Sequence, residues 1–222
     1  MMSGDERKGD VIEVCNVLLE KLGDFPQTDS TPEGRMVSQL RWLKERAEAG
    51  ELDLPVDPRY IGTLRYVYTE GALARLSDSY EEYVREIEVP LYRLMALTKD
   101  GSLLAKRSYY PYAARCVNKL VNILTSPQSR TLSPSESAAI PELEALEEKL
   151  KNEEIEPPVL GWRKSSAFGN FRKVYSLAGS SIDDLPRAKE ITRLVVDFVF
   201  NGKRPASWNT PEAADQQTAF SD

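Results

Sequence analysis

Apolar residues recur at three- and four-residue spacing in one segment of this chain after another, and prolines or glycines separate the segments. Such spacing places the apolar side chains on one face of an α-helix. No run of residues shows the alternation, bounded by turns, that is typical of a strand. The sequence therefore predicts an all-α fold, a compact single-domain bundle of about seven to eight helices.

Pro90 lies inside the most regular of these segments, which runs from Tyr80 to Met95. Because proline has no backbone N–H and its ring crowds the preceding turn, this helix is expected to be kinked near Pro90, at Val89. The apolar period also assigns Tyr60 and Tyr80 to the buried sides of their helices.

A further helix is predicted to start at Pro111, because proline suits the first turn of a helix. Its Arg115 and Lys119 lie on the solvent-facing side, opposite an apolar face. The residues of that apolar face are Ala113, Cys116, Val117, Leu120, Val121 and Leu124. Ser133 and Glu136 match a capping box, which predicts the start of the next helix.

The chain is expected to divide into one helical domain, residues 1–205, and a polar tail, residues 206–222, that frays. Residues 157–182 are the hardest part of the domain to assign. Phe168, Phe171 and Tyr175 fit a short helix, whereas three glycines in the same segment suit a loop or a small hairpin. The short helix is the preferred interpretation.

Charge is strongly segregated along a sequence whose net charge is −6. Residues 101–135 and 157–182 contain no Asp or Glu, and an acidic segment, residues 136–156, separates them. The two acid-free stretches hold cations and aromatic rings side by side. Cations can contact phosphates, and aromatic rings can stack on bases.

These two basic-aromatic stretches are the predicted partner-binding surface of the protein. The candidate residues of the first stretch are Lys106, Arg107, Tyr109, Tyr110, Tyr112, Arg115 and Lys119. Those of the second stretch are Trp162, Arg163, Lys164, Phe171, Arg172 and Lys173. If the stretches adjoin in the fold, they form one positive patch. The competing interpretation is structural: the rings pack on the core and the cations solvate its rim.

The acidic helix expected from Glu136 to Glu156 offers an alternative contact surface for a basic partner. Its structural interpretation is a solvated helix face. Small acidic helical inhibitors of toxins or nucleases share this general composition, but no motif supports the analogy.

Histidine is absent from the sequence, which excludes Ser-His-Asp and Cys-His nucleophile systems and the usual Cys/His zinc sites. Cys15 and Cys116 fall at apolar helix positions and are expected to be buried free thiols. Two groups of carboxylates remain as hypothetical Mg²⁺ ligands. They are Glu51, Asp53 and Asp57 in the first group and Asp183, Asp184 and Asp197 in the second. No cofactor and no metal site are predicted.

No apolar run approaches the roughly 18 to 20 residues that cross a bilayer, and the charged start lacks the apolar segment of a signal peptide. A cytoplasmic location without membrane attachment is therefore expected. We expect a non-catalytic macromolecule-binding protein, an adaptor, accessory or inhibitor, whose partner is another protein. One alternative is a nucleic-acid-binding accessory protein that uses the same surface. The other is a His-free, metal-dependent enzyme that relies on Asp and Glu.

Overall fold

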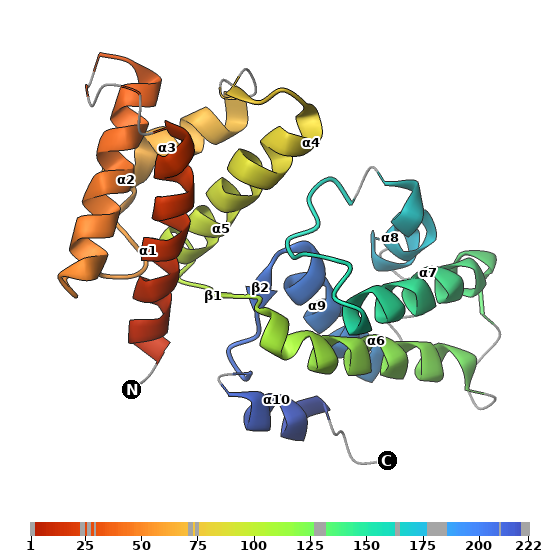
Figure 1. The fold of residues 1–222 in the computed structure, drawn as a ribbon. Coiled ribbons are helices and arrows are strands. Elements are labelled where there is room, and N and C mark those ends of the chain that lie inside the picture. The colour runs from red at the N-terminus through yellow and green to blue at the C-terminus, as the bar shows by residue number, and fades with distance from the viewer. Residues whose placement is uncertain are drawn as a thin grey trace. The chain divides into compact units, whose positions relative to one another are not determined.

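The computed structural model describes residues 3–22, 25, 28, 30–70, 73, 76–126, 132–162, 165–176, 186–208 and 210–218. Nearly all regular structure in these ranges is helical (Figure 1), so the predicted all-α class is confirmed. The chain divides into two compact units, Met1–Leu104 and Ala105–Asp222. Each unit has its own hydrophobic core. The domain expected over residues 1–205 thus spans unit 1 and most of unit 2, and the folding of these parts as one domain stays a prediction.

Unit 1, Met1–Leu104, is a group of helices in which α1 packs against α2 and α5, and α2 packs against α3 (Figure 1). Its elements are α1 (Ser3–Leu22), α2 (Pro32–Glu48), α3 (Pro58–Glu70), α4 (Tyr80–Tyr83), the π-helical turn η2 (Val84–Glu88), α5 (Val89–Thr98) and the short strand β1 (Leu103–Leu104). The apolar faces expected from the sequence form its core, with Leu18, Leu40 and Ile87 fully buried.

The predicted change in helix geometry near Pro90 takes the form of a π-helical turn. Residues Val84–Glu88 are π-helical, and α5 starts at Val89, whose N–H donates to the carbonyl oxygen of Val84. A π-turn shifts the hydrogen-bond register by one residue, which is one way for a helix to accommodate a proline that donates no hydrogen bond. Pro90 itself is buried in the core of unit 1.

Two tyrosines depart from the predicted apolar faces. Tyr60 is 53 % exposed and Tyr80 is 74 % exposed, so assigning both to buried sides is wrong. Tyr60 precedes Ile61, whose non-helical dihedral angles (φ −125°, ψ 15°) kink α3 and break the helical period. Tyr80 is the first residue of α4, directly after the N-cap Ser79, and its ring lies 6.3 Å from that of Tyr83 on the same helix.

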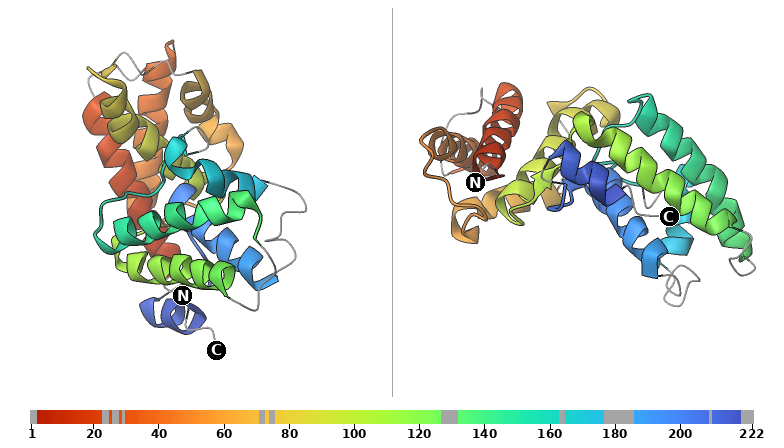
Figure 2. Two further views of the ribbon diagram at one scale, coloured as in Figure 1. Left: turned by 90° about the vertical axis from the view of Figure 1, so that its right-hand side faces the viewer. Right: turned by 90° about the horizontal axis from the view of Figure 1, so that it is seen from below.

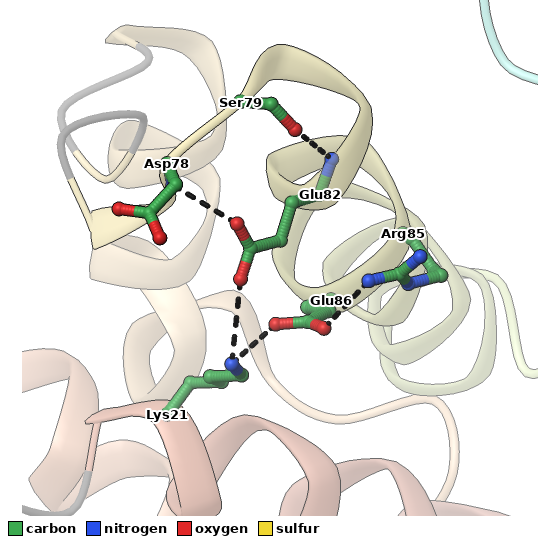
Figure 3. Close-up of polar contacts among 6 residues, drawn as sticks. All are labelled: Lys21, Asp78, Ser79, Glu82, Arg85 and Glu86. Atoms are coloured by element: carbon green, nitrogen blue, oxygen red, sulfur yellow. Dashed lines mark hydrogen bonds and ion pairs between the residues drawn. The ribbon is translucent and has the colours of Figure 1, made fainter.

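A network of charged side chains joins α1 to the helix that follows Ser79 (Figure 3). Lys21 at the end of α1 forms ion pairs with Glu86 and, at 3.9 Å, with Glu82. Arg85 holds Glu86 from the other side, with 2.9 Å between Nη2 and Oε1. These two cations hold the pKa of the Glu86 carboxyl below its usual range. Burial instead raises the pKa of Glu88.

Unit 2, Ala105–Asp222, is built on α6, which packs against α7, α9 and α10 (Figures 1 and 2). Its elements are the 3₁₀ turn η3 (Arg107–Tyr109), α6 (Tyr110–Thr125), α7 (Pro134–Lys151), the 3₁₀ turn η4 (Ser166–Phe168), α8 (Gly169–Ser176), α9 (Pro186–Val195), the π-helical turn η5 (Val196–Phe200), the short strand β2 (Lys203–Arg204) and α10 (Pro211–Thr218). The short helix expected within residues 157–182 is α8.

Local sequence signals in unit 2 are confirmed in detail. Every residue of the predicted apolar face of α6 is buried. Ser133 Oγ accepts from the N–H of Glu136, and the carboxylate of Glu136 accepts from the N–H of Ser133, which completes the capping box. Cys116, like Cys15 in unit 1, is a buried free thiol.

The segment expected to be a polar tail, residues 206–222, contains α10 and a fully buried Trp208. Ala214 on α10 is buried as well. The frayed state predicted for this tail stays a prediction, but part of the segment contributes to the core of unit 2.

Glu142 on α7 caps the start of α8. Its carboxylate accepts hydrogen bonds from the backbone N–H groups of Asn170 and Phe171, at 3.1 and 2.8 Å, and from the Asn170 side chain at 2.9 Å. A carboxylate here satisfies N–H groups that have no partner within the helix and lies at the positive end of the helix dipole. This contact connects α7 to α8 in addition to their apolar packing.

The substitution Glu142→Ala is expected to loosen the first turn of α8. Two backbone N–H groups lose their acceptor, which costs about 1 to 3 kcal/mol. Amide hydrogen exchange of Asn170 and Phe171, measured by NMR in the full chain, should accelerate by about tenfold or more. Glu144→Ala, an exposed change on the same helix, is the matched control and should leave both amides unchanged. Unchanged exchange in Glu142→Ala would contradict the capping role.

Glu86 and Glu88 are expected to affect the pH dependence of unit 1 stability in opposite directions. The raised folded-state pKa of Glu88 means that ionisation of this carboxyl opposes folding, so Glu88→Gln should stabilise unit 1 at neutral pH. The lowered pKa of Glu86 means that its ionised form favours folding, so Glu86→Gln should destabilise it. The Glu88 difference should disappear as the pH falls to about 4.3, the pKa of an unperturbed glutamate. The Glu86 difference should disappear only at lower pH, as the pH falls through the lowered pKa of the folded Glu86 carboxyl.

Urea unfolding followed by Trp42 fluorescence, in a background with Trp162 and Trp208 replaced by Phe, reports on unit 1 in this comparison. Glu81→Gln, an exposed change on α4, is the control. If Glu86→Gln and Glu88→Gln changed the free energy of unfolding in the same direction at neutral pH, the assignment of these two environments would be refuted.

Candidate partner-binding surface

The aromatic half of the first basic-aromatic stretch is buried in the core of unit 2. Tyr109 and Tyr110 are only 4 % and 3 % exposed. The Tyr109 ring lies parallel to that of Trp208, with 6.5 Å between centroids, and the Arg204 guanidinium lies over the Tyr109 ring at 4.4 Å. Tyr110 meets Phe198 edge to face at 6.0 Å. These tyrosines therefore pack the core in this structure, as the structural interpretation expects.

The other half of that stretch reaches the surface around the start of α6. Tyr112 is half-buried, and the Arg115 guanidinium lies 4.7 Å from its ring centroid. Arg115 pairs with Asp215 at 2.7 Å and Arg107 pairs with Glu153 at 3.6 Å, and all four side chains of these pairs are largely exposed. Lys106 and Lys119 are half-buried. We call Lys106, Arg107, Tyr112, Arg115 and Lys119 the α6 surface.

The second stretch divides in the same way. Trp162 and Phe171 are buried, and both pack on Phe200, with 4.3 and 5.8 Å between ring centroids. Arg172 is half-buried and Lys173 is exposed, both on α8. Arg163 and Lys164 lie outside the described residues.

The acidic helix α7 packs against both α6 and α8 and lies between them in the fold (Figure 1). Much of its acidic surface has a structural role: Glu136 completes the capping box and Glu142 caps α8. Glu147 accepts from the Asn118 side chain at 3.1 Å and pairs with Lys151. Glu144 and Glu148 remain exposed. The cations of α6 and α8 are thus on two helices separated by a helix that carries acidic groups.

Sequence reasoning missed the aromatic and basic residues that α2 and α3 bring together in unit 1. Trp42 stacks on Tyr60, with 5.0 Å between centroids and 15° between ring planes, beside a groove of about 440 Å³. One signal was present: Trp42 lies off the apolar stripe of α2, which runs through Met36, Leu40 and Leu43. The pairing with Tyr60 follows from the packing of two helices, which periodicity does not reveal.

Both thiols are buried, and two of the carboxylates considered as Mg²⁺ ligands, Asp57 and Asp197, already have hydrogen-bond partners. Burial raises the pKa of the Cys15 and Cys116 thiols to about 12, so neither is a nucleophile at neutral pH. Asp57 is bound by Arg59, which lowers the pKa of that carboxyl, and Asp197 accepts from Asn201 at 3.1 Å. Within the described ranges no three metal-ligating side chains gather at one place, and Asp183 and Asp184 lie outside them.

Compared with protein-family models, with curated proteins and with solved structures, the chain matched none. Across the parts of the chain that the structure describes, every helix is too short or too polar to span a bilayer.

The division between buried rings and surface cations predicts opposite responses to mutation. Tyr109→Ala is expected to destabilise unit 2 by about 3 to 5 kcal/mol, because it removes a large buried ring and leaves a cavity beside Trp208. Arg107→Ala is expected to change stability by less than about 0.5 kcal/mol, because its ion pair is exposed.

Urea unfolding in a Trp42→Phe background, where Trp162 and Trp208 fluorescence reports on unit 2, checks this contrast. Comparable stability losses in Tyr109→Ala and Arg107→Ala would show that the tyrosine is not part of the core in solution.

Proposed function

We propose that this protein is a non-catalytic, cytoplasmic macromolecule-binding protein, an adaptor, accessory or inhibitor, whose α6 surface contacts another protein. The observation that carries the proposal is the Tyr112–Arg115 pair. The Arg115 guanidinium lies 4.7 Å from the centroid of the Tyr112 ring at the surface of α6. The neighbouring rings of Tyr109 and Tyr110 are buried in the core. Tyrosine and arginine are enriched among the residues that dominate the energy of protein interfaces.

The ion pairs of the α6 surface favour exchange with a partner. Exposed pairs such as Arg107–Glu153 and Arg115–Asp215 contribute only about 0 to 1 kcal/mol. Carboxylates of a partner can therefore replace Glu153 and Asp215 at little cost in free energy. Arg107 and Arg115 then pair with the partner's carboxylates in a dehydrated interface, where ion pairs are stronger. The half-buried Tyr112 ring packs on Tyr109 and Trp208, with 6.0 and 6.4 Å between ring centroids, and this packing restricts the ring before binding and so lowers the entropic cost of binding.

The position of α7 supports a protein partner over a nucleic acid. A nucleic-acid strand that used the cations of both α6 and α8 would pass α7, where Glu144 and Glu148 are exposed and would repel its phosphates. The net charge of −6 opposes a polyanion at long range as well. The buried free thiols Cys15 and Cys116 agree with a cytoplasmic, reducing environment.

Reversal of charge on the α6 surface is the test. Tagged wild-type chain and the double variant Arg107→Glu, Arg115→Glu are used to capture partners from native cell extract, with and without nuclease, and bound proteins are identified by mass spectrometry. The wild-type chain should capture a protein stoichiometrically, and this capture should persist after nuclease treatment. The double variant should no longer capture that protein. Purified partner should then bind the variant about tenfold or more weakly.

Two further variants distinguish the possible outcomes. Lys149→Glu with Arg193→Glu makes the same change in charge on α7 and α9 and should leave capture intact. Arg172→Glu with Lys173→Glu shows whether α8 takes part. Retained capture by the Arg107→Glu, Arg115→Glu variant, with unchanged helical circular dichroism, refutes the proposal, and capture that disappears with nuclease makes nucleic acid the partner.

A further inference from the structure

The groove on unit 1 lies along the outer face of α2, where the first turn of α3 approaches it. Its volume is about 440 Å³, and the residues that line it are Arg35, Ser38, Gln39, Arg41, Trp42, Glu45, Arg59 and Tyr60. The residues of α2 recur at three- and four-residue intervals, so they form one continuous stripe on that helix. The groove therefore lies wholly within one compact unit.

Hydrogen bonds hold the α3 side of the groove in position. Ile61 has non-helical dihedral angles, and the N–H of Leu64 donates to Gln39 Oε1 on α2 at 3.2 Å. This bond connects the two helices at the groove, because Gln39 is one of the lining residues. Tyr60, one residue before the kink, lies nearly parallel to the Trp42 ring at 5.0 Å while 53 % of its surface stays exposed.

The groove is basic and aromatic in a part of the chain that is acidic overall. Residues 1–100 contain 13 basic and 20 acidic side chains, yet three arginines and one glutamate line this groove. Arg59 is oriented by Asp57, whose carboxylate accepts from Arg59 Nε and Nη2 at 3.0 and 2.6 Å. Arg35 is exposed and forms no ion pair within the described part of the chain.

We propose that this groove binds an acidic segment of another protein that carries a large apolar side chain. Carboxylates of the segment would pair with Arg35 and Arg59, and the apolar side chain would cover the exposed face of Tyr60. Exposed aromatic rings next to arginines are the composition of interface hot spots. A groove of this volume holds a few side chains, as a short peptide segment requires.

A peptide fits the groove better than a nucleic acid does. Trp42 and Tyr60 already stack on each other, so neither ring can be sandwiched between successive bases. Glu45 in the lining and Asp57 beside Arg59 repel the phosphates that follow one another along a nucleic-acid strand, whereas a peptide can place its carboxylates at the arginines and donate backbone N–H groups to Glu45 and Asp57.

The groove and the α6 surface belong to different units, so the proposed groove does not depend on the function proposed for the α6 surface. If both bind, the chain carries one partner site on each unit, which is the organisation of an adaptor. Binding at two sites also raises the overall affinity for any partner that reaches both.

Selection of peptides from a random library tests the groove without a known partner. Phage that display short linear peptides are panned on the immobilised full chain, and enriched peptides are synthesised with a fluorescent label for anisotropy titrations. Peptides rich in Asp and Glu that also contain an aromatic or large aliphatic residue should be enriched. Their affinity should fall about tenfold or more with Arg35→Glu and with Tyr60→Ala, and should weaken as salt is raised.

Three controls define the outcomes. Lys99→Glu makes the same change in charge on an exposed residue of unit 1 and should leave peptide affinity unchanged, as should Arg107→Glu with Arg115→Glu in unit 2. Lack of acidic peptides among those enriched, or equal affinity for wild type and Arg35→Glu, overturns the proposal. If single-stranded DNA binds more tightly than the enriched peptides and Arg35→Glu abolishes that binding, the occupant of the groove is a nucleic acid and not a peptide. If the chain forms a concentration-dependent dimer that Arg35→Glu dissociates, the occupant is a second copy of this chain.

Discussion

Burial of one apolar face per helix is the constraint on which the rest of this structure depends. The apolar stripes of α1, α2 and α5 cover one another in one core, and those of α6, α7 and α9 do so in a second. Once these faces are buried, the remaining sides of the helices determine which charges and rings reach solvent. The surfaces proposed for binding are consequences of that arrangement.

Aromatic packing in unit 2 shows how the core selects among chemically similar residues. Tyr109, Tyr110 and Tyr112 are neighbours in the sequence and have equal ability to stack or to donate a hydrogen bond. The first two face Trp208 and Phe198, and only Tyr112 keeps part of its ring near solvent. Cations divide differently, because long side chains bury their stems and keep the charge in water. The first basic-aromatic stretch, which is one cluster in the sequence, therefore forms a buried aromatic stack with arginines at its edge in the fold.

Charge segregation along the chain likewise acquires its meaning from the order in which helices pack. The acidic segment 136–156 separates the two basic stretches in sequence, and α7 separates α6 and α8 in space. Several of its glutamates serve local structure, as Glu136 and Glu142 show. In unit 1, folding creates a basic site from a stretch that is acidic overall. Trp42 and Tyr60, which are separated in the sequence, stack on each other beside three arginines. No linear count of charge reveals that basic groove.

The sequence by itself determined the helical class, the apolar faces, the capping box at Ser133 and the disturbance near Pro90, because each depends on contacts within about one helical turn. It also determined that both cysteines are buried, since their positions fall on apolar faces. Only the tertiary structure decided which tyrosines are core and which are surface, because ring burial depends on the helix packed opposite. The exposure of Tyr60, the burial of Trp208 and the groove between α2 and α3 belong to the same class: they result from contacts between residues that the chain brings together only when it folds.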